Sequence, residues 1–184
     1  MNTFLREALA YLKEHWHVGI TGTSDAAYLL DINANTFKTR LSRGQALVMR
    51  EQNGEQRANL TFTGYHLVYN LLSDRLLRYG FPVEHGEETQ AELPYIYAEW
   101  AFNNILSAPH HIEAILRFRK ESEGGSQNMV FEDGNVQDWT GDAALIIPIG
   151  TMIVRLAAAL HFRNAGTRRD QIARLVEANV AVGN

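Results

Sequence analysis

The residues best suited to chemistry lie between positions 35 and 43, where amide, hydroxyl and cationic side chains surround two apolar ones. Amide and guanidinium groups can hydrogen-bond the edges of bases, and hydroxyl and ammonium groups can bind phosphate oxygens. The candidate contacts in this stretch are Asn35, Thr36, Lys38, Thr39, Arg40 and Arg43. Arg40 has an alternative, since its side chain could pack along a helix or pair with Asp31. The residue types and their spacing therefore indicate nucleic-acid recognition.

A second polar stretch begins at Arg50 and reads REQNGEQRANLTFTG. Its Asn53-Gly54 pair supplies the positive φ angles of a tight turn, so the sequence predicts a hairpin. The expected strands are residues 46–50 and 57–62. Arg57 lies across the expected turn from Arg50. Both a solvated loop and a wing that lies against DNA fit this pattern.

The charge is unevenly distributed along the chain, whose formal net charge is −4 over 184 residues. Residues 35–60 carry five basic and two acidic residues, whereas residues 83–184 carry eight basic and fourteen acidic residues. A local basic patch matters more for phosphate binding than the charge of the whole chain. The acidic total therefore does not exclude a nucleic-acid partner.

Two short helices separated by a polar turn are expected to position the residues at 35–43. Thr23 or Ser24 can accept a hydrogen bond from the free N–H groups at the start of the first helix. Three residues that favour turns and caps separate the helices: Asp31, Asn33 and Asn35. In the second helix Phe37 and Leu41 lie four residues apart and face inward, and Gly44 can end it.

Longer amphipathic helices flank this pair. Residues 3–16 have one apolar face, made of Leu5, Ala8, Leu12 and Trp16. Residues 65–81 have another, made of Leu67, Leu71, Leu72, Leu76 and Tyr79. Tyr65 and His66 begin the second of these helices, where phosphate oxygens can meet free N–H groups. Ordinary capping and packing is the alternative for both residues.

Residues 24–82 resemble the winged-helix DNA-binding region of the MerR-type regulators in the order and spacing of four motifs. The motifs are Thr36-Phe37-Lys38, Arg50-Glu51-Gln52-Asn53-Gly54 with Arg57, Phe62-Thr63, and Tyr79-Gly80-Phe81. The resemblance implies that Lys38 and its neighbours read DNA in the major groove. It also implies that Arg50, Asn53 and Arg57 belong to a wing on the phosphate backbone. An excisionase-like architectural factor or a protein-binding adaptor would use the same winged helix.

The composition changes at residues 83–93, which are acidic and contain a glycine, so a linker is expected there. This divides the chain into a winged helix-turn-helix domain at 1–82 and a small α+β domain at 94–184 that dimerises or receives an effector. The expected elements of the second domain are a helix at 94–108, a hairpin around EGGS, a strand at AALIIPI, and helices at 151–163 and 170–182. The fold class is therefore helix-rich α+β.

Other kinds of site have weaker support. The aromatic residues of 94–108 could line a small-molecule pocket, or they could belong to the core or to a dimer interface. They are Tyr95, Tyr97, Trp100 and Phe102. His110 and His111 lack the HExxH spacing and a third ligand, although an enzyme centred on them is a further hypothesis. The absence of cysteine excludes disulfides, thiol catalysis and cysteine zinc sites. We therefore expect no catalytic residue, no metal and no cofactor.

These observations together predict a sequence-specific transcription regulator that binds double-stranded DNA as a homodimer. A contact with RNA polymerase or another protein partner stays open. The N-terminus lacks the pattern of a secretory signal. The longest apolar stretch, AALIIPIGTMIV, is too short to span a bilayer and contains Pro148 and Gly150, so no membrane association is expected. The absence of cysteine fits a cytoplasmic location.

Overall fold

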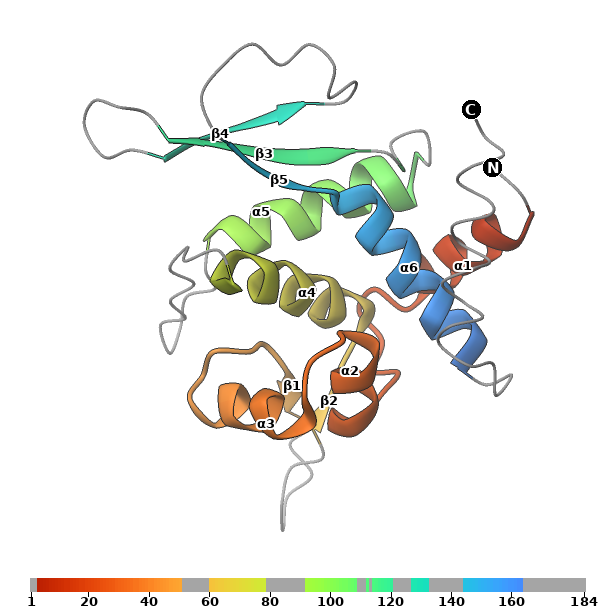
Figure 1. The fold of residues 1–184 in the computed structure, drawn as a ribbon. Helices are drawn as coiled ribbons and strands as arrows, with labels where there is room; N and C mark the ends of the chain where they lie inside the picture. The colour runs from red at the N-terminus through yellow and green to blue at the C-terminus, as the bar shows by residue number, and fades with distance from the viewer. Residues whose placement is uncertain are drawn as a thin grey trace.

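The structure is a computed structural model that describes residues 3–50, 60–78, 92–108, 112, 114–120, 127–132 and 144–163. Helices dominate these residues, and two small antiparallel sheets accompany them, so the predicted helix-rich α+β class is confirmed. Figure 1 shows the three-stranded sheet at one end of the molecule and the two-stranded hairpin, with two short helices, at the other.

The described residues of the N-terminal half form four helices and two very short strands. They are α1 (Thr3–Glu14), α2 (Thr23–Leu29), α3 (Ala34–Ser42), β1 (Met49–Arg50), β2 (Leu60–Thr61) and α4 (Gly64–Arg78). β1 and β2 are antiparallel, with Met49 opposite Thr61. An isolated bridge between Thr21 and Phe62 adds a third extended segment beside β2. The predicted hairpin is therefore present, with strands of two residues each, and its turn at 53–54 lies outside the described residues.

The C-terminal half combines helices with the larger sheet. Its elements are α5 (Glu92–Ala101), the π-helical turn η1 (Phe102–Leu106), β3 (Ile115–Lys120), β4 (Gln127–Glu132), β5 (Ala144–Ile147) and α6 (Ile149–Phe162). The strand order is β4-β3-β5, and both pairs are antiparallel. The predicted hairpin, third strand and following helix are therefore confirmed, whereas the predicted helix 170–182 lies outside the described residues.

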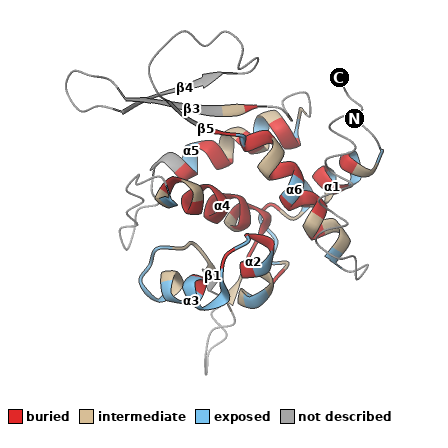
Figure 2. Ribbon diagram, in the orientation of Figure 1, coloured by how far each residue is buried: buried red, intermediate tan, exposed pale blue. Residues whose placement is uncertain are grey.

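Helix α4 forms the centre of the molecule, between the α2–α3 pair and α5 (Figure 1). Eleven of its fifteen residues are buried, including the predicted apolar stripe of Leu67, Leu71, Leu72 and Leu76. A helix that is buried on nearly all sides must satisfy its polar residues through neighbouring elements. Figure 2 shows α4 as an almost continuous buried ribbon, in contrast to the exposed α3.

Helix α1 packs against α6, so the two ends of the described chain meet. The rings of Phe4 and Phe162 have centroids 4.3 Å apart, and the ring of Tyr11 lies 5.7 Å from that of His161. The buried residues of both halves form one hydrophobic cluster. The division into domains at 1–82 and 94–184 stays a prediction, but the two segments share a core. Most of the expected linker lies outside the described residues, and its last two residues already belong to α5.

Candidate nucleic-acid interface

A tight polar turn orients α3 against α2. The side-chain oxygen of Asn33 accepts hydrogen bonds from the backbone N–H groups of Asn35 at 3.0 Å and Thr36 at 3.3 Å, so Asn33 is the N-cap of α3. Asp31 has a φ of 58°, in the left-handed region that aspartate tolerates better than most residues. Gly44, with a φ of 67°, ends the helix as predicted.

The start of α2 differs from the expectation. Gly22 is the N-cap residue and Thr23 is already helical, with no side chain capping the helix. The prediction that Thr23 or Ser24 caps α2 was therefore wrong. The observed capping fits the preferences of the backbone, because glycine is also accepted at N-caps.

The outward and inward faces of α3 follow the predicted pattern. Phe37 is fully buried and its ring lies 5.4 Å from that of Phe62, while Leu41 is half-buried. The exposed residues that the sequence predicts as DNA contacts, which we call the α3 face, are Asn35, Thr36, Lys38, Thr39 and Arg43. The Thr39 hydroxyl donates to the carbonyl of Asn35 at 2.9 Å, so its proton is already used within the helix.

Arg40 is less exposed than the α3 face and pairs with a residue of α4, while its assignment as a DNA contact stays a prediction. Its Nη1 lies 2.7 Å from Oδ1 of Asp74 in α4, and the Asp74 side chain is only 1% exposed. The second carboxylate oxygen of Asp74 lies 2.8 Å from Nε of Arg78. The buried carboxylate of Asp74 is thus a partner of Arg40 that lies far from it in the sequence.

A buried amide fixes the segment that leads from α3 to β1. Oδ1 of Asn70 accepts from the backbone N–H of Leu47 at 2.9 Å, and Nδ2 of Asn70 donates to the carbonyl of Leu47 at 2.8 Å. The amide thus satisfies both backbone groups of Leu47, as a strand partner would. Asn70 and Asp74 were not among the residues predicted from the sequence. Their spacing of four residues, on the helix face between the leucines of α4, is the signal that would have found them.

Tyr65 is not available to phosphate, which corrects its assignment as a DNA contact. Its side chain is buried beside Trp16, and its backbone N–H donates to the carbonyl of Trp16 at 3.0 Å. Burial also raises the pKa of the Tyr65 hydroxyl. The neighbouring N–H of Gly64 donates to the carbonyl of His15 at 2.8 Å. The end of α1 therefore covers the start of α4, and the packing alternative is confirmed.

Thr63 and His66 cap α4 reciprocally. The backbone N–H of His66 donates to Oγ1 of Thr63 at 3.2 Å, and the backbone N–H of Thr63 donates to Nδ1 of His66 at 3.2 Å. Histidine here occupies the place of the glutamate in a capping box. Burial, followed by the charge of His17, lowers the pKa of His66 to about 4. The imidazole is therefore neutral at pH 7.

The expected wing is described only at its base. Arg50 lies in β1 opposite Leu60, whereas Asn53 and Arg57 lie outside the described residues. Between α3 and the hairpin the surface has a hollow of about 370 Å³. The residues that line it are Thr23, Lys38, Leu41, Ser42, Val48 and Leu60. The hairpin therefore lies beside Lys38.

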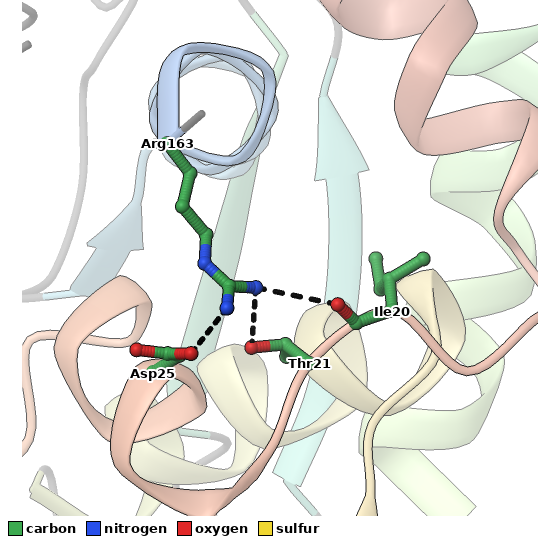
Figure 3. A network of polar contacts seen from close by, with 4 residues as sticks. All are labelled: Ile20, Thr21, Asp25 and Arg163. Atoms are coloured by element: carbon green, nitrogen blue, oxygen red, sulfur yellow. Dashed lines mark hydrogen bonds and ion pairs between the residues drawn. The ribbon is translucent and has the colours of Figure 1, made fainter. Parts of the chain in front are cut away.

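Arg163, which follows α6, connects the C-terminal half to the start of α2 (Figure 3). Its guanidinium donates to Oγ1 of Thr21 at 2.8 Å and to the carbonyl of Ile20 at 3.2 Å, and it pairs with the carboxylate of Asp25. Thr21 is the residue that bridges to Phe62 beside the hairpin. This contact was not predicted from the sequence, because nothing local links residues about 140 positions apart.

The other candidate sites receive little support from the described residues. Tyr97 is buried, which raises its pKa to about 12, and Phe102 packs against Trp16 with centroids 5.0 Å apart. These two residues therefore belong to the core, whereas Tyr95 is 45% exposed. His110 and His111 lie outside the described residues. Within the described part of the chain, no three His, Asp or Glu side chains gather as a metal site would require.

The chain matches no protein-family model, no curated protein and no solved structure. The resemblance of residues 24–82 to MerR-type regulators therefore stays a prediction from the sequence. In the part of the chain that the structure describes, no helix has the length and apolar character needed to cross a membrane.

Proposed function

We propose that this protein is a sequence-specific DNA-binding transcription regulator whose N-terminal half is a winged helix-turn-helix. One observation carries the proposal. A short helix with a buried Phe37 presents a polar and basic face to solvent, with a second helix behind it and an antiparallel hairpin beside it. In such an arrangement the exposed helix, here α3, enters the major groove and the hairpin tip reaches the backbone.

The dimensions and chemistry of α3 support this role. An α-helix with its side chains is about 10–12 Å across, which fits the width of the major groove, about 12 Å. Asn35 and Thr36 lie at the N-terminal end of α3, the end that approaches the bases first. An asparagine amide can bond adenine, and Lys38 and Arg43 can bond guanine or phosphate. Thr39 contributes less than expected, because its proton is engaged within the helix.

A homodimer fits this recognition surface. One short helix discriminates only a few base pairs, and two copies on adjacent half-sites combine their discrimination. We assign Arg50, Asn53 and Arg57 to backbone contacts from the wing. Such contacts raise the affinity without selecting the sequence.

A protein-binding adaptor with the same winged helix is the second candidate. The pairing of Arg40 with Asp74 favours it, because it leaves Lys38 and Arg43 as the exposed cations of α3 and its C-cap. Two cations give weaker attraction to phosphate than the sequence indicates. Binding to duplex DNA as a function of salt separates the two candidates.

The decisive experiment selects genomic DNA fragments with the purified full-length protein. We expect the bound fragments to share a motif. The double variant Lys38→Ala/Arg43→Ala should lose more than tenfold in affinity for that motif, because each good base contact contributes about 1–3 kcal/mol. Arg6→Ala, which removes an exposed cation from α1, is the control and should bind normally. Binding that does not fall with salt, or no enriched motif, would refute the proposal.

A further inference from the structure

The ion pair between Arg40 and Asp74 differs from the other charges of α3 in its burial. The Asp74 side chain is 1% exposed and that of Arg40 is 20% exposed, whereas Lys38 and Arg43 are exposed. A buried carboxylate needs a cation beside it, because burial of an unpaired charge is strongly unfavourable. Arg40 is therefore occupied in the folded protein.

The same pair restrains the orientation of α3. Asp74 and Asn70 lie one turn apart on α4, so they face the same side of that helix. Asp74 contacts α3 through Arg40, and Asn70 bonds Leu47 just beyond the end of α3. These two contacts join the central helix to α3 and to the segment that follows it. Neither Asp74 nor Asn70 is exposed.

We propose that Asp74 is a positioning residue that determines the sequence selectivity of α3. It keeps the Arg40 charge away from the phosphate backbone and fixes the angle at which the α3 face meets the bases. The inference rests on the proposed DNA binding. A free Arg40 would add a contact that attracts every sequence equally, so its retention by Asp74 lowers binding to unrelated DNA.

The test compares Asp74→Asn, Arg40→Gln and the double variant Asp74→Asn/Arg40→Gln with the wild-type protein. Asp74→Asn has nearly the shape of the original side chain but removes the negative charge that pairs with Arg40. Its binding to unrelated duplex DNA should acquire a salt slope steeper by about 0.9, which corresponds to roughly fivefold tighter binding at 0.15 M salt. The ratio of specific to unrelated binding should fall by at least the same factor.

The other two variants assign the effect to Arg40. Arg40→Gln should retain the wild-type salt slope, because Arg40 contacts no phosphate in the wild-type protein. The double variant should also retain it, which excludes the freed Arg78 as the source of the change. Circular dichroism establishes that each variant is folded. If Asp74→Asn does not fold, the salt slope of Arg40→Gln still tests the inference. We expect that variant to fold, since Arg78 remains to pair with Asp74.

Three results would overturn the inference. A salt slope that falls by about one in Arg40→Gln would show that Arg40 does bind phosphate. A folded Asp74→Asn with an unchanged slope would show that Asp74 does not withhold the Arg40 charge from DNA. In either case the proposed function stands, because the wild-type protein still binds DNA. Wild-type protein that shows no salt-dependent binding would instead refute the proposed function, and the inference with it.

Discussion

The contact between the start of α4 and the end of α1 leads to a prediction whose sign is unusual. Gly64 is the first residue of α4, and a Cβ atom there would lie 2.9 Å from the carbonyl oxygen of Leu12 and 3.1 Å from that of His15. Replacing glycine by alanine in an uncrowded helix normally stabilises a protein by roughly 0.5–1 kcal/mol. At Gly64 the crowding opposes this gain.

The expected magnitude follows from the rigidity of the two neighbours. Two of the three close atoms are backbone oxygens and the third is Cδ1 of Leu12, and the hydrogen bond from Gly64 N–H to the His15 carbonyl, at 2.8 Å, prevents α4 from moving away. Overpacking of this kind costs about 1–3 kcal/mol. Subtraction of the helix propensity leaves about 0–2.5 kcal/mol, and within that range we expect Gly64→Ala to lower the free energy of unfolding by about 1–2 kcal/mol. The melting temperature should fall by roughly 2–8 °C.

The assay is urea unfolding followed by circular dichroism, with Gly22→Ala as the matched control. Gly22 also lies at the start of a helix, but a Cβ atom added there would have no heavy atom within 4 Å beyond its immediate neighbours, so no crowding arises. We expect Gly22→Ala to lose only about 0.5 kcal/mol, through the weaker N-cap preference of alanine. If Gly64→Ala is more stable than the wild-type protein, α1 does not cover the start of α4. Tyr65 would then be accessible to phosphate.

Two further predictions concern His66 and Arg163. Because the pKa of His66 is lowered to about 4 in the folded protein, its contribution to stability is fully present above about pH 6.5 and is lost as the pH falls to about 4. The free energy of unfolding, measured with urea, should fall by at most about 3 kcal/mol over this pH range. If a His66→Gln variant keeps the same pH dependence of stability, His66 is not its source. Arg163→Gln should lower the free energy of unfolding by only about 1 kcal/mol, because its ion pair with Asp25 is partly exposed. The same variant should speed amide hydrogen exchange in α2, because it removes a contact at the start of that helix. Energetic additivity of Arg163→Gln with Asp25→Asn would show that the pair contributes nothing.

Periodicity predicted the helices well, because burial of one face is a local property of the sequence. Leu5, Ala8 and Leu12 are buried in α1 as expected, and so is the stripe of α4. The strands beside α3 are shorter than expected, at two residues each. A sheet of this size is set by the elements around it, such as the Thr21 bridge, and not by strand propensity alone.

The candidate site was predicted less completely, because exposure depends on partners far along the chain. Arg40, three residues after Phe37, lies towards the buried side of α3 and pairs with Asp74, whereas Lys38 lies on the exposed side. Tyr65 has the sequence position of a phosphate contact but is covered by the end of α1. The sequence showed that cations and polar residues gather near α3, whereas the tertiary contacts decide which of them reach solvent.

The packing of α1 on α6 also affects how the chain folds during synthesis. Phe4 and Phe162 are among the first and last described residues, and they contact each other. Since a ribosome adds about 5–20 residues per second, the partner of α1 emerges roughly 10–30 s after α1 itself. Contacts of such long sequence separation slow folding. We therefore expect the part of the α1 face that packs on α6 to need a chaperone, or a transient substitute contact, until α6 has been synthesised.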